Sequence, residues 1–126
     1  MPLRCLIVDD NARFRESMRD LLESEGLVVV GTPASGAEAV RIARELRPDL
    51  ALVDIDLGEE SGFDVVRMLD NEVRPPPRLI LISTHDGREI SELVAGSGAL
   101  GFLAKLDLSA ATITELLARV DDAGPR

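Results

Sequence analysis

Short, continuously apolar runs alternate with amphipathic segments along the chain. Five runs have the length and apolar character of strands that are buried on both faces of a sheet; they cover residues 3–8, 27–32, 49–54, 78–83 and 99–104. The segments that follow these runs have apolar residues at helical spacing; they cover residues 11–25, 36–47, 61–71, about 87–96 and 110–122. This alternation predicts an α/β domain in which helices cover both faces of a five-stranded parallel sheet.

Capping and stop residues mark the ends of several predicted helices. Ser35 and Glu38 form a capping-box pattern at the start of the second helix, which we expect to end before Pro48. Gly26 is typical of the residue that follows a helix, and Ser109 is a suitable N-cap for the last one. Local sequence and hydrophobic pattern therefore agree on these boundaries.

Polar residues follow every predicted strand except the second. They are Asp9 and Asp10, Asp54, Ser83 and Thr84, and Lys105. In an open parallel sheet, ligands bind beyond the carboxyl ends of the strands, near the point where the strand order reverses. The topology therefore predicts that these side chains meet at one edge of the sheet, although they come from positions spread over most of the chain.

This set of side chains favours phosphate chemistry with a divalent cation. Three carboxylates in one pocket raise each other's pKa unless a cation neutralises them, and Mg²⁺ prefers oxygen ligands such as these. Two acids can then hold the ion while a third attacks phosphorus and becomes an acyl phosphate. A hydroxyl group and an ammonium group can receive the phosphoryl oxygens of an in-line displacement.

Composition narrows the class of protein. The 126 residues are 45% hydrophobic, as expected of one domain with its own core. A net charge of −9 and an aromatic content of 2% disfavour direct nucleic-acid binding. The single cysteine, Cys5, cannot form an internal disulfide, and with no secretory signal we expect a cytoplasmic location. No apolar run is long enough to cross a membrane.

Basic residues are distributed unevenly between the two types. Thirteen of the fourteen are Arg, and the one Lys is Lys105, directly after the fifth apolar run. Lys is a compact charge on a flexible stem and is not interchangeable with Arg. Its position favours a functional role over chance in an Arg-rich sequence.

Four motifs, taken in order, resemble the receiver domain of two-component response regulators. They are "VDD" at 8–10, "LVDIDLGEESGFDV" at 52–65, "LILIST" at 79–84 and "GFLAK" at 101–105. The resemblance implies a flavodoxin-like, doubly wound (βα)5 fold with strand order 2-1-3-4-5. It also implies that residues 1–122 form the receiver domain and that 123–126 are a tail or the start of a linker.

The resemblance assigns roles to the acidic residues. It implies that Asp54 is the phosphoacceptor and that Asp9 and Asp10 bind Mg²⁺, with Asp10 the more direct ligand. Asp54 and the backbone carbonyl of Asp56 complete the implied metal ligands. Ser83 matches the switch hydroxyl, Lys105 matches the phosphate-binding lysine, and Phe102 matches the aromatic side chain that rotates on activation.

The same resemblance implies a signalling role. A sensor histidine kinase is expected to donate the phosphoryl group, and the domain is expected to catalyse only its own phosphorylation and dephosphorylation. The fourth helix, fifth strand and fifth helix, residues 87–122, are the expected output and homodimer surface. We expect that surface to control an output such as transcription, without direct contact between this domain and nucleic acid or membrane.

The sequence departs from the family pattern at several positions. The turn after the acceptor is "DLGEESG" instead of Met-Pro-Gly, and Leu106 stands where a proline with a cis peptide bond is usual. We interpret Glu59 and Glu60 as solvated turn charges. Asp56 and His85 occupy the two positions that tune phosphoryl hydrolysis in the family, and we hypothesise that they face each other across the site entrance.

Other interpretations exist for these residues. Asp9 and Asp10 can simply cap a helix, and Phe102 can be an ordinary core residue. A phosphohydrolase of the haloacid dehalogenase type also uses a D-x-D motif, here Asp54 and Asp56. However, that motif belongs on the first strand in that family, and this chain lacks room for a cap domain. A degenerate receiver that only binds partners is a third alternative.

Overall fold

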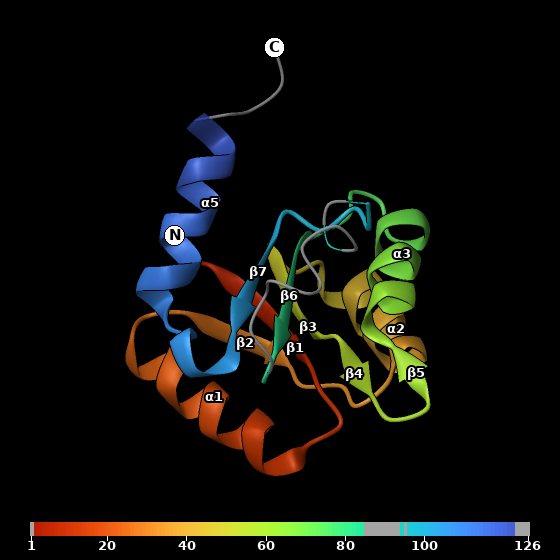
Figure 1. Ribbon diagram of the computed structural model, residues 1–126, viewed down its shortest axis with the longest axis horizontal. Coiled ribbons are helices and arrows are strands. Elements are labelled where there is room, and N and C mark those ends of the chain that lie inside the picture. Colours follow the sequence, from red (N-terminus) through yellow and green to blue (C-terminus); the bar gives the residue numbers. More distant parts are fainter. Residues whose placement is uncertain (1, 85–93, 95, 123–126) are drawn as a thin grey trace.

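The computed structural model describes residues 2–84, 94 and 96–122, and within them a five-stranded parallel sheet (Figure 1). Its strands are β1 (Arg4–Val8), β2 (Val28–Gly31), β3 (Leu50–Asp54), β6 (Arg78–Ser83) and β7 (Gly101–Ala104). The strand order is β2-β1-β3-β6-β7. This order is the predicted 2-1-3-4-5 arrangement of the five sheet strands, so the doubly wound fold is confirmed.

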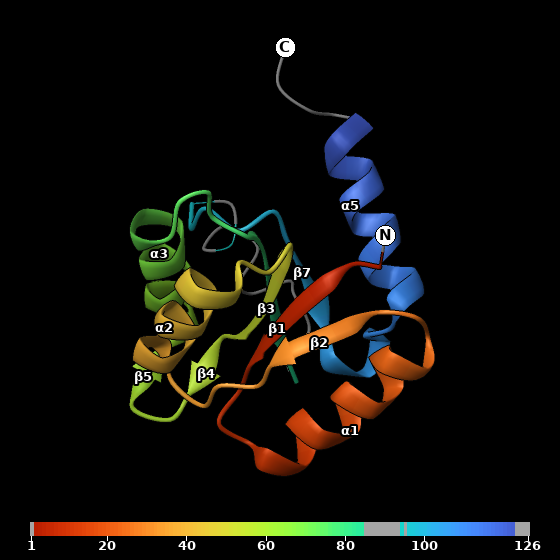
Figure 2. The same ribbon diagram turned by 180° about the vertical axis from the view of Figure 1, so that it is seen from behind.

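Helices cover both faces of the sheet. Helices α1 (Ala12–Ser24) and α5 (Ala110–Asp122) lie on one side, and α2 (Gly36–Leu46) and α3 (Gly62–Glu72) lie on the other (Figures 1 and 2). None of the described helices is both long and apolar enough to cross a membrane. The predicted helix at 87–96 falls outside the described residues apart from positions 94 and 96.

Alternate residues of each strand pack into two separate layers of the hydrophobic core, one on each face of the sheet. In β1, Leu6 and Val8 pack toward α2 and α3, whereas Cys5 and Ile7 pack toward α1 and α5. All five residues of β3 are buried. Continuous apolar runs are therefore required, because each strand has helices on both faces.

Side-chain caps fix the helix starts. Asn11 caps α1, where its Oδ1 accepts a hydrogen bond from the Phe14 amide at 3.1 Å. Ser35 caps α2 as predicted, and Glu38 reaches back to the Ala34 amide at 2.9 Å. These caps satisfy amides that have no partner within the helix.

A small hairpin stands where the sequence analysis expected only a turn. Strands β4 (Asp56–Leu57) and β5 (Glu60–Ser61) pair antiparallel around Gly58, whose φ of 74° favours glycine. Glu60 is half-buried, and its Oε1 accepts a hydrogen bond from the Gly36 amide at 2.8 Å. The interpretation of Glu60 as a solvated charge was therefore wrong, whereas Glu59 is exposed.

The backbone after β7 also differs from the family pattern. A short 3₁₀ helix, η1 (Lys105–Asp107), follows the strand directly. Among the described residues the cis peptide bond is Arg74–Pro75, so the bond between Lys105 and Leu106 is trans. Leu106 is 97% exposed, and the side chain that replaces proline points into solvent.

Candidate functional site

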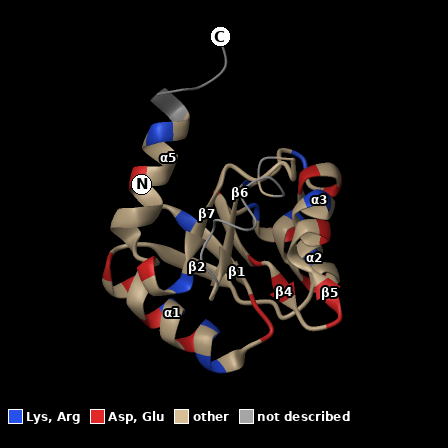
Figure 3. Cartoon of the chain, in the orientation of Figure 1, with Lys and Arg blue, Asp and Glu red and all other residues tan. Residues whose placement is uncertain are grey.

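The carboxyl ends of β1, β3 and β6 and the start of η1 line one pocket of about 240 Å³. Its lining contains all six polar residues that the sequence placed at strand ends, together with Asn11, Asp56 and Gly58. Acidic residues also gather at this end of the sheet, on the loop after β1 and on the β4–β5 hairpin (Figure 3). The parallel sheet thus brings together side chains that are far apart in the sequence.

A second groove, of about 550 Å³, lies between α2 and α3. Arg44 in its wall donates to the Glu72 carbonyl and lies 3.6 Å from the Glu72 carboxylate. These are ordinary surface pairs. The smaller pocket is the candidate site because it holds buried charges and potential nucleophiles.

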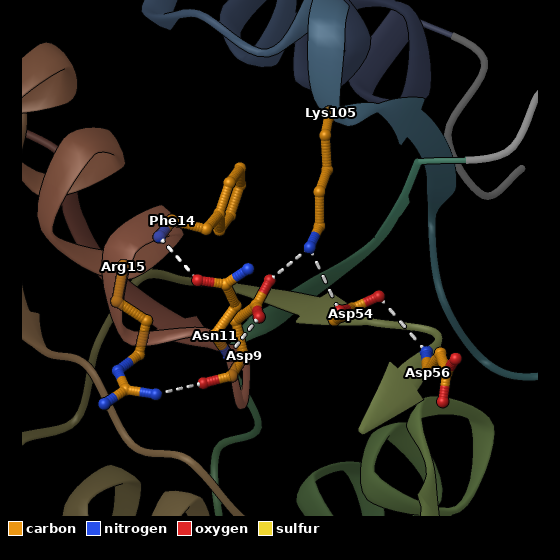
Figure 4. Close-up of polar contacts among 7 residues, drawn as sticks. All are labelled: Asp9, Asn11, Phe14, Arg15, Asp54, Asp56 and Lys105. Carbon is orange, nitrogen blue, oxygen red and sulfur yellow. Dashed lines mark hydrogen bonds and ion pairs between the residues drawn. The ribbon is translucent and has the colours of Figure 1, made fainter. Parts of the chain in front are cut away.

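Asp9 is fully buried at the end of β1, and three groups hold it (Figure 4). Its Oδ1 accepts from the Asn11 amide at 2.8 Å, and its backbone carbonyl accepts from the Arg15 guanidinium at 2.6 Å. Its Oδ2 lies 2.6 Å from the Lys105 ammonium as an ion pair. The start of α1 thus fixes the orientation of the Asp9 carboxylate.

Asp54 is buried at the end of β3, and its two oxygens have different partners (Figure 4). Oδ1 accepts from the Asp56 amide at 3.1 Å, and Oδ2 accepts from the Lys105 ammonium at 3.1 Å. Burial raises the pKa of the Asp54 carboxyl, and the negative charge of Asp9 adds to this, although the Asp56 amide and Lys105 act in the opposite direction.

Lys105 links the two buried acids. Its side chain is only 12% exposed, and its ammonium contacts both Asp9 and Asp54. Burial alone lowers the pKa of a lysine, but the two carboxylates outweigh burial, so the pKa of Lys105 is raised. This single lysine therefore remains protonated and neutralises part of the acidic charge.

The residues fit a divalent cation. Asp9, Asp10 and Asp54 each offer an oxygen, and these oxygens lie within 4.8 Å of one another. Oδ2 of Asp9 is buried and has the Lys105 ammonium at 2.6 Å as its partner, so one positive charge already lies beside these acids. Asp10 is exposed at the pocket mouth. Mg²⁺ prefers hard oxygen ligands such as these carboxylates and usually keeps some water ligands, which the open mouth of the pocket can admit.

The remaining predicted residues lie in or beside the pocket. Ser83 is buried at the end of β6, whereas Thr84 and Asp56 are exposed. Phe102 on β7 is half-buried and packs against the core beneath α2 and α3. His85 falls outside the described residues, so the expected pairing of His85 with Asp56 stays a prediction.

Sequence reasoning missed one neighbour of the site. Phe14 is one of the apolar residues at helical spacing within residues 11–25, yet its ring centroid lies 4.1 Å from the Lys105 ammonium. The sequence does contain a hint of this contact, because residue 14 lies about one helical turn after Asp10. The contact spans 91 positions, however, and only the fold reveals it.

Comparison with known proteins agrees with this geometry. The model of the response regulator receiver domain family matches residues 5–119. A putative transcriptional regulator of Pseudomonas aeruginosa is 31% identical over 90% of this chain and 53% of its own length. A protein-glutamate methylesterase/protein-glutamine glutaminase of Alkalilimnicola ehrlichii is 37% identical over 83% of this chain and 27% of its own length.

Solved structures show the same fold. A LuxR-family two-component response regulator from Aurantimonas superimposes with a TM-score of 0.82 at 27% identity, over 97% of this chain and 87% of that one.

The chain spans about half or less of the length of the two curated relatives described above. The family match covers both strand-end acidic motifs and Lys105, and it supports the receiver interpretation over the phosphohydrolase alternative. The chain belongs to the response regulator receiver domain family.

Proposed function

We propose that this chain is a phosphoacceptor of a two-component phosphorelay, and that Asp54 takes a phosphoryl group from a sensor histidine kinase. One observation carries the proposal: the buried Asp54 carboxylate pairs with the Lys105 ammonium and lies close to the carboxylates of Asp9 and Asp10. An aspartate with a purely structural role would not require a buried lysine and two further carboxylates beside it. We propose that the receiver domain extends over residues 1–122.

The transfer uses groups that are already in place. A carboxylate oxygen of Asp54 forms a bond to phosphorus while the bond from phosphorus to the donor nitrogen breaks. Lys105 lies 3.1 Å from Asp54 Oδ2, so its ammonium can pair with a phosphoryl oxygen. The Asp56 amide holds Asp54 Oδ1 at 3.1 Å and orients the carboxylate.

Mg²⁺ is the proposed cofactor. Asp9, Asp10, Asp54 and the Asp56 backbone carbonyl would hold it, and when bound it supplies positive charge that offsets the acids and the phosphoryl oxygens. The closeness of the three carboxylates, whose oxygens lie within 4.8 Å of one another beside a single lysine, supports this assignment.

Phosphorylation is proposed to switch the surface that includes β7 and α5. Ser83 ends β6 and is paired in register with Ala104, and Phe102 lies on the same edge strand. A phosphoryl group on Asp54 would attract the Ser83 hydroxyl, and Phe102 would then turn inward. The added charge biases an equilibrium between two surface conformations.

The proposed partners and output follow from the family. A histidine kinase donates the phosphoryl group, a second copy pairs through the face that includes β7 and α5, and the domain performs no chemistry beyond its own phosphorylation and dephosphorylation. Relatives with longer chains include a putative transcriptional regulator and a methylesterase. Control of transcription in the cytoplasm is the output that we propose, without nucleic-acid or membrane contact by this domain.

Asp56 is proposed to tune the lifetime of the phosphoryl group. Its side chain is exposed at the pocket mouth, where a negative charge repels phosphate and hinders an attacking water. We expect Asp56→Asn to change the half-life of phosphorylated protein, measured by loss of the phosphoryl mass after removal of the donor. An unchanged half-life would refute this role.

Intact-protein mass spectrometry tests the proposed function. After treatment with acetyl phosphate and Mg²⁺, we expect the wild-type protein to gain one phosphoryl group and Asp54→Asn to gain none. Continued turnover of a generic phosphate ester would instead favour a phosphohydrolase, and equal labelling of the two proteins would contradict the role of Asp54.

A further inference from the structure

The Lys105 ammonium is enclosed on three sides. Asp9 lies at 2.6 Å, Asp54 at 3.1 Å, and the centroid of the Phe14 ring at 4.1 Å (Figure 4). The two carboxylates attract the ammonium toward the pocket, and the aromatic ring faces it from α1. The side chain of Lys105 is 12% exposed as a result.

The position of the Phe14 ring is tied to the acidic loop itself. The Phe14 amide donates to Asn11 Oδ1 at 3.1 Å, and the Asn11 amide donates to Asp9 Oδ1 at 2.8 Å. The next residue, Arg15, donates to the Asp9 carbonyl at 2.6 Å. One short hydrogen-bonded segment therefore holds both the Asp9 carboxylate, which pairs with Lys105, and the backbone of Phe14, whose ring faces Lys105.

Phe14 packs against the core layer beneath α1 and α5, but packing does not require an aromatic ring at this position. Phe14 is half-buried at the start of α1, whereas Met18 and Leu22 on the same helix form the buried contact with the core. An aliphatic side chain could cover the core at position 14, but it offers no π face. A cation over an aromatic face is attracted by the quadrupole of the ring, more strongly where water is excluded.

We propose that Phe14 is a positioning residue for Lys105. The face of its ring lies 4.1 Å from the ammonium and restricts its movement, so the flexible lysine stem keeps its charge aimed at Asp54. This proposal rests on the proposed function, in which Lys105 pairs with a phosphoryl oxygen on Asp54. Phe14 touches neither the donor nor the phosphoryl group and acts through Lys105 alone.

The single lysine of the chain makes the contact directly observable. Growth with ¹³C- and ¹⁵N-labelled lysine gives signals for one residue, Lys105. Protons above an aromatic face are shifted upfield, so we expect the Lys105 Hε signals upfield of their ordinary position in the wild-type protein. They should return toward it in Phe14→Leu and remain displaced in Phe14→Tyr, which keeps the ring.

A matched control separates the ring contact from loss of an aromatic side chain. Phe63 is half-buried on α3 and packs against the other core layer. Phe63→Leu should leave the Lys105 signals in place. If Phe14→Leu does not fold, Phe14→Met replaces it. Lys105 signals at their ordinary position in the wild-type protein would overturn the proposal whatever the variants do.

Rates of phosphorylation by acetyl phosphate with Mg²⁺ complete the test. We expect Phe14→Leu to slow labelling about fivefold, as the loss of one cation–π contact predicts, and Phe14→Tyr to restore most of the rate. A folded Phe14→Leu that is labelled at the wild-type rate would contradict positioning. If the wild-type protein is not labelled at all, the proposed function fails, but the lysine signals still decide whether Phe14 holds Lys105.

Discussion

Asp54 is held by two donors of different character, the Asp56 amide and the Lys105 ammonium. The amide comes from the same loop and fixes one oxygen, whereas the ammonium comes from 51 positions further along the chain and pairs with the other. Lys105 also pairs with Asp9, so one positive charge serves two buried acids. The pocket thus still contains an excess of negative charge for a cation to neutralise.

Cys5 is a buried titratable residue on β1 outside the pocket. Its burial affects the stability of the protein and not the chemistry of the site. Burial raises the pKa of its thiol from 9.0 to about 12. Because the unfolded chain loses this proton first, the free energy of unfolding should fall by about 1.4 kcal/mol per pH unit between about pH 9 and pH 12.

Denaturant unfolding of the wild-type protein and Cys5→Ala across this range measures the effect. The difference in unfolding free energy between the two proteins should shrink as pH rises through the window, and below pH 9 it should be constant. A difference in unfolding free energy between the two proteins that does not depend on pH would contradict a raised pKa of the Cys5 thiol.

At the scale of residues, the contacts within the site were predictable from the sequence only where the order and direction of the strands determine them. Asp9, Asp54 and Lys105 follow strands that must run parallel, so their meeting at one edge follows from the pattern of elements. The contact between Phe14 and Lys105 depends instead on where α1 lies over the sheet, which no local pattern encodes.

The hairpin of β4 and β5 connects the acceptor loop to α2. Its strand residue Glu60 accepts from the Gly36 amide at the start of α2, so a carboxylate caps a helix that begins 24 positions earlier. A negative charge at a helix N-terminus is favourable. Gly62, directly after the hairpin, cannot be replaced without movement, because a Cβ there would lie 2.0 Å from the Asp54 carbonyl oxygen.

Glu60→Ala should therefore destabilise the protein. Loss of one charge-assisted hydrogen bond at a helix start predicts a decrease of about 1–2 kcal/mol in unfolding free energy, measured by denaturant unfolding. Glu59→Ala is the matched control, since Glu59 is exposed and should change stability little. Equal effects of the two substitutions would show that the Glu60 contact contributes nothing.

Element-level prediction succeeded for long apolar strands and failed for the hairpin. A run such as β3 is continuously apolar and long enough for a buried strand. Strands β4 and β5 have only two residues each, and four of the six residues from 56 to 61 are polar. Glu60 looked solvated because its partner, Gly36, lies outside any local window.

Across the whole molecule, acidic charge is in excess and part of it is concentrated at one end. The chain carries a net charge of −9, and three of its aspartates offer oxygens within 4.8 Å of one another. Their repulsion opposes folding in the absence of a cation. The parallel α/β sheet was predictable because strand number and crossover handedness leave few topologies, whereas the strand order was predicted from the family resemblance.

Mg²⁺ should therefore stabilise the folded protein. A ligand at a concentration 100 times its Kd contributes about 2.7 kcal/mol to the free energy of unfolding, and the midpoint of thermal unfolding should rise with added Mg²⁺. Asp10→Asn should remove most of this rise. Asp20→Asn makes the same change of charge at an exposed position on α1 and should retain it. A rise that survives Asp10→Asn unchanged would place the cation elsewhere.

The central claim is that Asp54 accepts the phosphoryl group, and peptide mapping after borohydride reduction tests it most directly. Borohydride reduces an acyl phosphate on aspartate to homoserine, which marks the acceptor position permanently. After treatment with acetyl phosphate and Mg²⁺, we expect homoserine at position 54 and unmodified Asp9, Asp10 and Asp56. Homoserine at another of these aspartates, or at none, would contradict the account.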